Sequence, residues 1–154
     1  MRFRLSRTIP HTPWRAENTW SLSLQRFAIL IFGLALFGIG DGLLVVAHIG
    51  NAPWSVLAQG LSLRTNIALG WWTFFISTIV LLIWIPLREK PGFGTIANIV
   101  VIATFIQLTV DLLPTPSALR SQLTLSIIGV ITVGAGSALY LTCGLGPGPR
   151  DGLM

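Results

Sequence analysis

The chain contains 154 residues, of which 53% are hydrophobic and only 10% are charged. Soluble globular domains carry charge on about a quarter of their residues, so this composition excludes that class and predicts a membrane protein. The net charge of +5 does not indicate nucleic-acid binding, because the basic residues lie between apolar segments instead of on one polar surface.

Residues 1–23 are polar and basic, and we expect them to form a cytoplasmic tail. The apolar stretch behind them is as long as a membrane span, and no small-residue cleavage site follows it at signal-peptide distance. The sequence therefore predicts a retained tail and not a removed signal peptide.

Four apolar segments are long enough to cross a hydrocarbon core of about 30 Å at about 1.5 Å per helical residue. They predict an all-α fold, a polytopic transmembrane helical bundle with spans at residues 27–47, 67–87, 95–113 and 123–143. Among the basic residues, only Arg64 and Arg120 fall on one side of these spans, and all the others fall on the opposite side. The positive-inside rule therefore predicts a cytoplasmic N-terminus.

A short helix is predicted to begin at Pro53, directly after the first span. Proline is favourable at the first helical position, and Trp54, Leu57, Ala58 and Leu61 share one helical face. The helix is too short to cross the membrane, so it either lies along the interface or enters the protein as a re-entrant segment. The sequence leaves both alternatives open.

The second and third spans differ in character. Tryptophans near both ends of the second span, including Trp84, are expected to anchor it at the level of the lipid headgroups. The third span carries Asn98, Gln107 and Asp111 and is the most polar of the four. We therefore expect it to face other helices instead of lipid.

One pattern of glycines, leucines and prolines occurs twice, and each member of the second copy lies 96 positions after its counterpart. The first copy is Gly33, Gly38, Gly40, Leu43, Gly50, Pro53 and Leu57, and the second is Gly129, Gly134, Gly136, Leu139, Gly146, Pro149 and Leu153. An odd number of membrane crossings separates the copies, so the two units should have opposite orientations. This is the three-plus-three inverted repeat common among secondary transporters.

The duplication divides the chain into a first three-span unit, residues 24–118, and the beginning of a second unit, residues 119–154. A second unit of equal length would end near residue 214, so we expect this chain to lack roughly two further spans.

Small residues in the first and fourth spans mark predicted packing surfaces. Gly38 with Gly42, and Gly134 with Ala138, have the small-x-x-x-small spacing that lets two backbones approach closely. Because the first helices of inverted units often cross near their pseudo-two-fold axis, we predict that these two surfaces meet. Contact with other spans is the alternative. The full predicted set of packing residues is Gly38, Gly40, Gly42, Gly134, Gly136 and Ala138.

Several stretches of the sequence carry a family resemblance, namely residues 34–40, 48–57 with 60–62, 85–88, 91–95 and 144–154. They resemble the YczE/YitT-type family of bacterial multi-pass integral membrane proteins, most specifically in the run Gly-Leu-Gly-Pro-Gly-Pro-Arg-Asp-Gly-Leu. The resemblance implies a helical protein of the bacterial cytoplasmic (inner) membrane whose activity is largely unassigned. It implies no catalytic or ligand-binding residue, and Asp41 does not belong to the family pattern.

Residues 38–41 spell a Gly-x-Gly-Asp that resembles intramembrane aspartyl proteases, in which two carboxylates share a proton and activate water. Asp111 supplies a second carboxylate, but that family places its other aspartate in an earlier helix. A protease is therefore only the third hypothesis. His11 and His48 lie on opposite sides of the membrane, and the glycine-rich run before Pro149 lacks a P-loop ending. No catalytic residue, metal site or cofactor is predicted.

The leading hypothesis is a secondary transporter or permease for an unidentified small solute or ion, in which one repeat rocks against the other around a central site. An aspartate inside a span costs about 2.5 to 3.5 kcal/mol on insertion scales, so Asp41 should face the protein interior or a water-filled cavity. Pairing with Arg64 near the end of the span is the alternative. The pathway candidates are Asp41, Asn51, Pro53, Ser137, Pro149, Arg150 and Asp151.

The runner-up function is a non-transporting membrane scaffold or accessory protein that uses its glycine-rich faces to pack against a partner. The expected partners are the lipid bilayer and the small solute or ion, without nucleic acid. A homo-oligomer is compatible with the sequence.

Overall fold

The computed structural model describes residues 12–16, 18–87 and 90–151, and the structural statements below concern these residues. They form helices and no strands. The five helices are α1 (Leu24–Ala47), α2 (Pro53–Thr65), α3 (Leu69–Leu87), α4 (Phe93–Leu112) and α5 (Leu119–Thr142). The predicted all-α fold is confirmed, and α1, α3, α4 and α5 are each long and apolar enough to cross a membrane.

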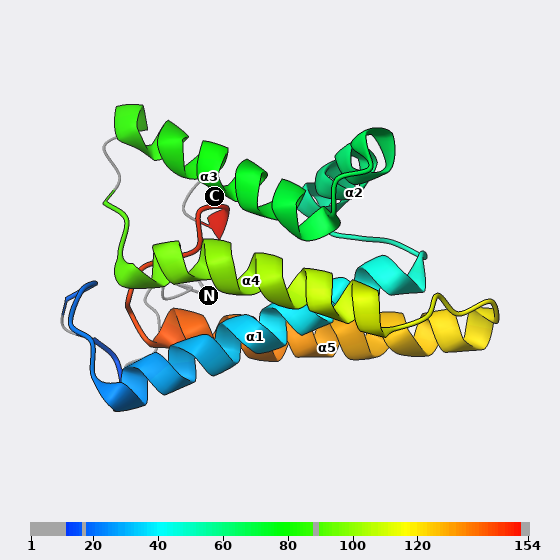
Figure 1. Ribbon diagram of the computed structural model, residues 1–154. Coiled ribbons are helices and arrows are strands. Elements are labelled where there is room, and N and C mark those ends of the chain that lie inside the picture. Colours follow the sequence, from blue (N-terminus) through cyan, green and yellow to red (C-terminus); the bar gives the residue numbers. More distant parts are fainter. Residues whose placement is uncertain (1–11, 17, 88–89, 152–154) are drawn as a thin grey trace, which may run out of the picture.

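Helix α1 forms the centre of the bundle. It packs along α5 and along α4, while α4 also packs against α3. Figure 1 shows α1, α4 and α5 side by side, with α3 above α4 and the short α2 beside the beginning of α3. We call the end at which α1 and α4 begin the N-terminal end, and the other end the Arg120 end.

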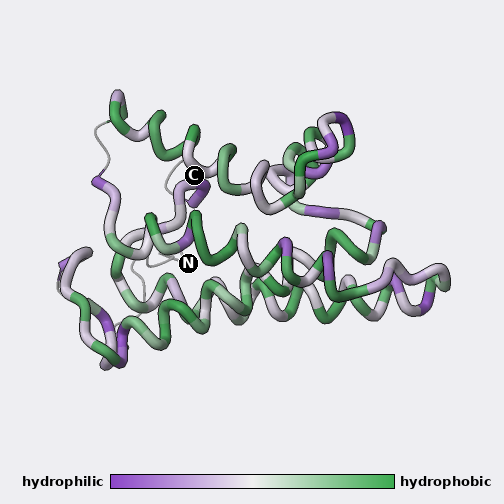
Figure 2. Tube along the Cα trace, in the orientation of Figure 1, coloured by the Kyte–Doolittle hydropathy of each residue, from purple (hydrophilic) through white to green (hydrophobic). Residues whose placement is uncertain are grey.

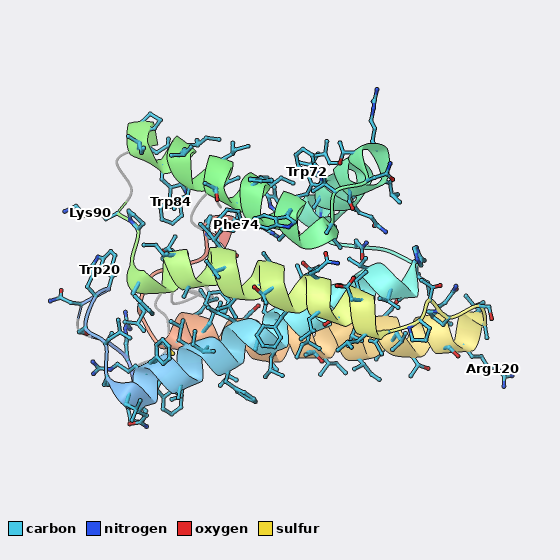
Figure 3. The ribbon with its side chains drawn as sticks, in the orientation of Figure 1. Trp20, Trp72, Phe74, Trp84, Lys90 and Arg120 are labelled. Atoms are coloured by element: carbon cyan, nitrogen blue, oxygen red, sulfur yellow. The ribbon has the colours of Figure 1, made fainter. Side chains whose placement is uncertain are left out.

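The two ends of the bundle are polar, as a membrane-spanning arrangement requires. Figure 2 shows apolar residues along the helices and hydrophilic ones mostly near their ends and in the connections. Figure 3 shows Trp20 and Lys90 at the N-terminal end and Arg120 at the opposite end. Predicted tail residues 1–11 lie outside the described residues. The described part of the tail is tied to α5, because the Ala16 N–H donates to the Cys143 carbonyl at 2.8 Å.

The helix boundaries follow from local chemistry. Ser23 caps α1 by accepting a hydrogen bond from the N–H of Arg26, and His48 ends the helix in the left-handed conformation with φ 56°. As predicted, α2 begins at Pro53, and it ends at Asn66, which is also left-handed with φ 55°.

Helices α1 and α5 are antiparallel, and their backbones approach closely at glycines. A Cβ atom on Gly136 would lie 2.6 Å from the nitrogen of Phe37 and 2.7 Å from the carbonyl oxygen of Gly33. Further along the crossing, a Cβ atom on Gly40 would lie 2.8 Å from the carbonyl oxygen of Gly129. No larger side chain fits at these positions, so glycine is what allows the two helices to touch.

The predicted meeting of the Gly38/Gly42 surface with the Gly134/Ala138 surface is wrong. Gly38 and Gly42 face α4 instead, and a Cβ atom on Gly38 would lie 2.7 Å from that of Phe105. Nothing lies within 4 Å of a Cβ atom added to Gly134, and Ala138 is exposed. Gly38 and Gly40 are two residues apart in α1, as are Gly134 and Gly136 in α5, and residues two apart point about 160° away from each other around a helix. The spacing of small residues alone therefore did not reveal which side of each helix takes part in the contact between α1 and α5.

The expectation that the third span faces other helices is confirmed. Helix α4 lies between α1 and α3, and 50% of its most apolar stretch is buried, compared with 17% for α5. Its Gln107 side chain accepts a hydrogen bond from the N–H of Gly70 at 2.8 Å, which joins α4 to the beginning of α3.

Candidate functional site

Residues 144–151, which we call the C-terminal segment, leave α5 at the N-terminal end and fold back between α3 and α4 (Figure 1). The Leu145 carbonyl accepts a hydrogen bond from the N–H of Gly94 at 2.8 Å. The Pro147 carbonyl accepts one from the Thr95 hydroxyl at 2.7 Å. The segment is therefore held inside the bundle by the first turn of α4.

Trp84 holds the same segment from α3. Its indole Nε1 donates to the Pro149 carbonyl at 3.1 Å, and the side chain is only 2% exposed. The prediction that Trp84 anchors the span among lipid headgroups is therefore wrong. A tryptophan near the end of an apolar span usually serves as an anchor, and only the fold-back of a distant segment gives this one a buried partner.

Asp41 of α1 is a buried carboxylate, 2% exposed. The Ser55 hydroxyl, in the first turn of α2, lies 2.7 Å from Oδ2 and 2.9 Å from Oδ1 of Asp41 and donates to the carboxylate. The expectation that Asp41 faces the interior is confirmed. The alternative pairing with Arg64 does not occur, because Arg64 is exposed in the last turn of α2.

Arg150 of the C-terminal segment extends to the middle of α3, where its Nη2 donates to the Ser77 hydroxyl at 3.4 Å. Burial lowers the pKa of Arg150, while the negative charges of Asp41 and then Asp151 raise it. Because a guanidinium titrates far above neutrality, Arg150 stays cationic and attracts both carboxylates.

Asp151 completes the group by accepting a hydrogen bond from the Tyr140 hydroxyl of α5. Side chains from four helices and the C-terminal segment thus come together, with Asp41, Ser55, Ser77 and Tyr140 buried, Arg150 half-buried and Asp151 exposed. We call this group the charged cluster, and it consists of Asp41, Ser55, Ser77, Tyr140, Arg150 and Asp151. Two carboxylates against one guanidinium give the cluster a formal charge of about −1 at neutral pH.

A cavity of about 20 Å³ borders the charged cluster, which is room for about one water molecule. Asn98 of α4 lines it and is buried. A Cβ atom on Gly148 would lie 2.7 Å from Asn98 Nδ2, so glycine lets the segment approach this amide closely. Arg150 and Asp151 also line the cavity.

The other predicted pathway residues lie apart from the cluster. Asn51 donates from Nδ2 to Gln59 at 2.9 Å, and its Oδ1 is buried without a partner among the described residues. Pro53 is exposed at the start of α2, and Ser137 is half-buried one turn before Tyr140. In the described part of the chain, no hydrogen bond joins any of these three predicted residues to the charged cluster.

The two carboxylates that an intramembrane protease would need are held by different partners. Asp111 accepts a hydrogen bond from Gln107 Nε2 at 2.6 Å and lines an apolar groove of about 520 Å³ between α3 and α4. Asp41 is bonded to Ser55 instead. The described residues also contain no group of three or more His, Cys, Asp or Glu side chains that could hold a metal ion.

Sequence reasoning missed Ser55, Ser77 and Tyr140. The duplication held a signal for Ser55, because Asp41 and Ser55, 14 residues apart, correspond to Ser137 and Asp151 in the second copy. An aspartate and a serine therefore exchange places between the copies at the same separation. Ser77 carried no such signal, because only the fold-back of Arg150 gives it a role.

A bundle of four long apolar helices with charged side chains in its interior is a polytopic membrane protein. The chain belongs to a family of unknown function, DUF6198, whose family model matches residues 24–154. The resemblance to YczE-type proteins is confirmed by the relatives described next. No solved structure was found to match the chain.

Three curated relatives lack an assigned function. An uncharacterized protein of Haemophilus influenzae is 48% identical over 96% of this chain and 68% of its own length. The uncharacterized membrane protein YczE of Bacillus subtilis is 29% identical over 88% of the chain and 60% of its own length. The uncharacterized protein YyaS of Bacillus subtilis is 28% identical over 79% of the chain and 62% of its own length. The matches therefore cover roughly three fifths to two thirds of each relative.

Proposed function

We propose that the protein is a secondary transporter or permease for a small solute or ion, and that the charged cluster is its central site. The observation that carries the proposal is the burial of Asp41 inside a membrane-spanning helix, where its carboxylate is bonded to Ser55 and is attracted by the half-buried Arg150. A charge inside a span costs about 2.5 to 3.5 kcal/mol on insertion scales, so such residues are usually kept for the passage of ions, protons or substrates.

We further propose that residues 24–118 and the part that begins at residue 119 are inverted copies of one unit. The crossing of α1 and α5 supports this, because Gly33 faces Gly136 while Gly40 faces Gly129. In the duplicated pattern, Gly33 corresponds to Gly129 and Gly40 to Gly136. Two contacts related in this way are what a local two-fold axis between inverted copies would produce.

The two segments after the first helix of each copy are proposed to be re-entrant, entering from opposite ends of the bundle. Ser55, two residues after Pro53, reaches back to Asp41 within α1, and Arg150, directly after Pro149, reaches Ser77 within α3. Rocking of one copy against the other would then open the cluster alternately to each end.

We expect Asn51 and Pro147 to be accessible from opposite faces of the bacterial cytoplasmic membrane, with the N-terminal end in the cytoplasm. The uneven distribution of arginine and lysine supports this orientation. Single-cysteine variants Asn51→Cys and Pro147→Cys, in a Cys143→Ala background, would be labelled with a membrane-impermeant maleimide in intact cells and in inverted vesicles. Labelling of both from the same face would contradict the inverted repeat.

The transport proposal is tested with purified protein in liposomes, using this chain and the full-length Haemophilus influenzae relative in parallel. A set of solutes and ions is offered under an imposed gradient. We expect at least one of them to move, and Asp41→Asn to reduce its flux at least about tenfold because the variant lacks the buried charge. Asp111→Asn, on the exposed side of α4, should keep the flux. No flux of any solute in either protein would contradict transport.

The alternative function, a non-transporting scaffold, is supported by the open surface of α5, where no described atom lies within 4 Å of a Cβ atom added to Gly134 and where Ala138 is exposed. It predicts co-purification with one partner in a fixed ratio and no effect of Asp41→Asn on that complex.

A further inference from the structure

One face of α1 is buried, whereas the corresponding face of α5 is open. The buried residues of this face follow each other at intervals of four and are Leu34, Gly38 and Gly42. Their counterparts 96 positions later are all exposed, and we call them the open face of α5: Val130, Gly134 and Ala138. The contrast is largest between Leu34, which is 0% exposed, and Val130, which is 61% exposed.

Helix α4 is what covers this face of α1. A Cβ atom on Gly42 would lie 2.6 Å from the Cβ atom of Thr109 in α4, whereas no described atom lies within 4 Å of a Cβ atom added to Gly134. The difference is confined to this face, because Gly33 and its counterpart Gly129 are buried in both helices. The open face of α5 therefore lacks a helix in the position that α4 takes on α1.

The connection between α1 and α2, residues 48–52, differs from the C-terminal segment in the same way. In the C-terminal segment, Leu145 is buried, and its carbonyl accepts a hydrogen bond from the first turn of α4. Its counterpart Ile49 is 46% exposed. The neighbouring Asn51 has a buried Oδ1 without a partner among the described residues. This connection thus also lacks the contact that α4 gives to its counterpart.

We propose that the open face of α5 is the docking surface for a transmembrane helix of the same polypeptide, the counterpart of α4 in the second copy, and that the first turn of this helix also contacts residues 48–52. The proposal rests on the inverted repeat proposed above and not on transport. Helix α4 itself contacts α1 of its own copy and the C-terminal segment of the other copy. A two-fold axis between α1 and α5 would therefore bring both open surfaces to one and the same helix.

The longer relatives have room for such a helix. The match to the Haemophilus influenzae relative covers 148 residues and 68% of its length, so that protein has about 220 residues. Two copies of equal length would end near residue 214. The unmatched part, about 70 residues, is enough for two spans of about 20 residues each with their connections.

The side chains of the open face suit a helix better than lipid. Gly134 and Ala138 have the small-x-x-x-small spacing that lets a second backbone pack closely. Another side of both helices carries large apolar residues that are exposed in each copy, namely Phe32 in α1 and its counterpart Ile128 in α5. We expect that side to face lipid, and it supplies the control for the test.

The test uses the full-length Haemophilus influenzae relative without its other cysteines. One cysteine replaces the residue aligned with Ala138, and the second lies 96 positions after the residue aligned with Thr109, which is the counterpart of the Gly42–Thr109 contact. We expect oxidation in the native membrane to crosslink at least about half of the protein within one polypeptide. Moving the second cysteine about two turns earlier, to the counterpart of Ile102, should lower the yield at least about fivefold.

A single substitution keeps the proposal testable if paired cysteines disturb folding. Gly134→Val should leave the unfolding temperature of this chain almost unchanged, because no described atom lies within 4 Å of the new Cβ atom. At the aligned position of the full-length relative, valine should lower the unfolding temperature by about 5 °C or more, because it would press against the docked helix. Ile128→Val, on the side expected to face lipid, should have little effect in either protein.

A crosslink between two copies, or a folded double-cysteine relative that forms no crosslink, would overturn the docking surface. An equally small effect of valine in both proteins would overturn it as well. In each case, labelling of Asn51 and Pro147 from opposite faces would leave the inverted repeat intact. A crosslink in the expected register in a protein without any flux would support the docked helix and reject only the transport function.

Discussion

Arg150→Met is expected to destabilise the protein by about 1 to 2 kcal/mol, in the lower part of the range for leaving a buried polar group without a partner. Methionine fills much of the volume of the arginine side chain but leaves Asp41 and Asp151 without the cation that attracts them both. The buried carboxylate of Asp41 then keeps only its hydrogen bond from Ser55, while Asp151 is exposed. We place the loss at the lower end because Arg150 retains part of its surface exposed.

A double-mutant cycle separates this charge effect from lost packing. Asp41→Asn together with Arg150→Met restores the formal charge of the cluster, so the pair should recover most of the stability that Arg150→Met loses. The measurement is thermal unfolding in detergent, followed with a thiol-reactive dye, because the single cysteine, Cys143, is buried in the folded chain.

Arg64→Met is the matched control, because Arg64 is exposed in the last turn of α2. It should change stability by less than about 0.5 kcal/mol, as surface substitutions usually do. If Arg150→Met lost no more stability than Arg64→Met, the cluster would not be held together by charge, and the proposed central site would lose its main support.

The parts of the fold that depend on local composition could be predicted from the sequence. The C-terminal ends of all four predicted spans agree with the ends of the helices to within a residue, because a polar residue, a proline or a glycine follows each apolar run. The start of α5 was placed a few residues late, because a polar first turn that includes Arg120 and Gln122 belongs to the helix but not to the apolar stretch. The start at Pro53 was predicted because proline favours the first helical position.

The faces of the helices could not be predicted in the same way. A span is apolar on every side, so the alternation of polar and apolar residues that marks the inner face of a soluble helix is missing. Gly38 and Gly40 are equally small, and only the rotation of α1 decides that one meets α4 and the other α5. The burial of Asp41 could be predicted because a charge facing lipid is costly. The Arg150–Ser77 contact spans 73 residues of chain and has no local signature.

The inverted repeat, the assignment of residues 119–154 to a second unit and the expected continuation to about residue 214 remain predictions. Their support comes from the exchange of aspartate and serine between the copies and from the paired glycine contacts of α1 and α5. Both observations involve polar residues or glycines, whereas a chance similarity between two apolar segments is expected to match mainly their aliphatic residues.

Gly136→Val is expected to separate α1 from α5 and to prevent stable folding or lower the unfolding temperature strongly. The new Cβ atom would lie 2.6 Å from the nitrogen of Phe37 and 2.7 Å from the carbonyl oxygen of Gly33. Both are backbone atoms, which cannot move aside as a side chain can, so the whole helix must shift. Overpacking a tight contact costs about 1 to 3 kcal/mol and sometimes more.

Gly134→Val is the matched control on the same helix, because nothing lies within 4 Å of a Cβ atom added at Gly134. The two variants introduce the same side chain two residues apart, so their helix propensity and added volume are equal, and only the contact with α1 differs. Unfolding temperatures measured through Cys143 should fall strongly for Gly136→Val and little for Gly134→Val. Equal losses in both would place the close contact of α5 on another face, and the local two-fold axis through Gly33, Gly40, Gly129 and Gly136 would then have no basis.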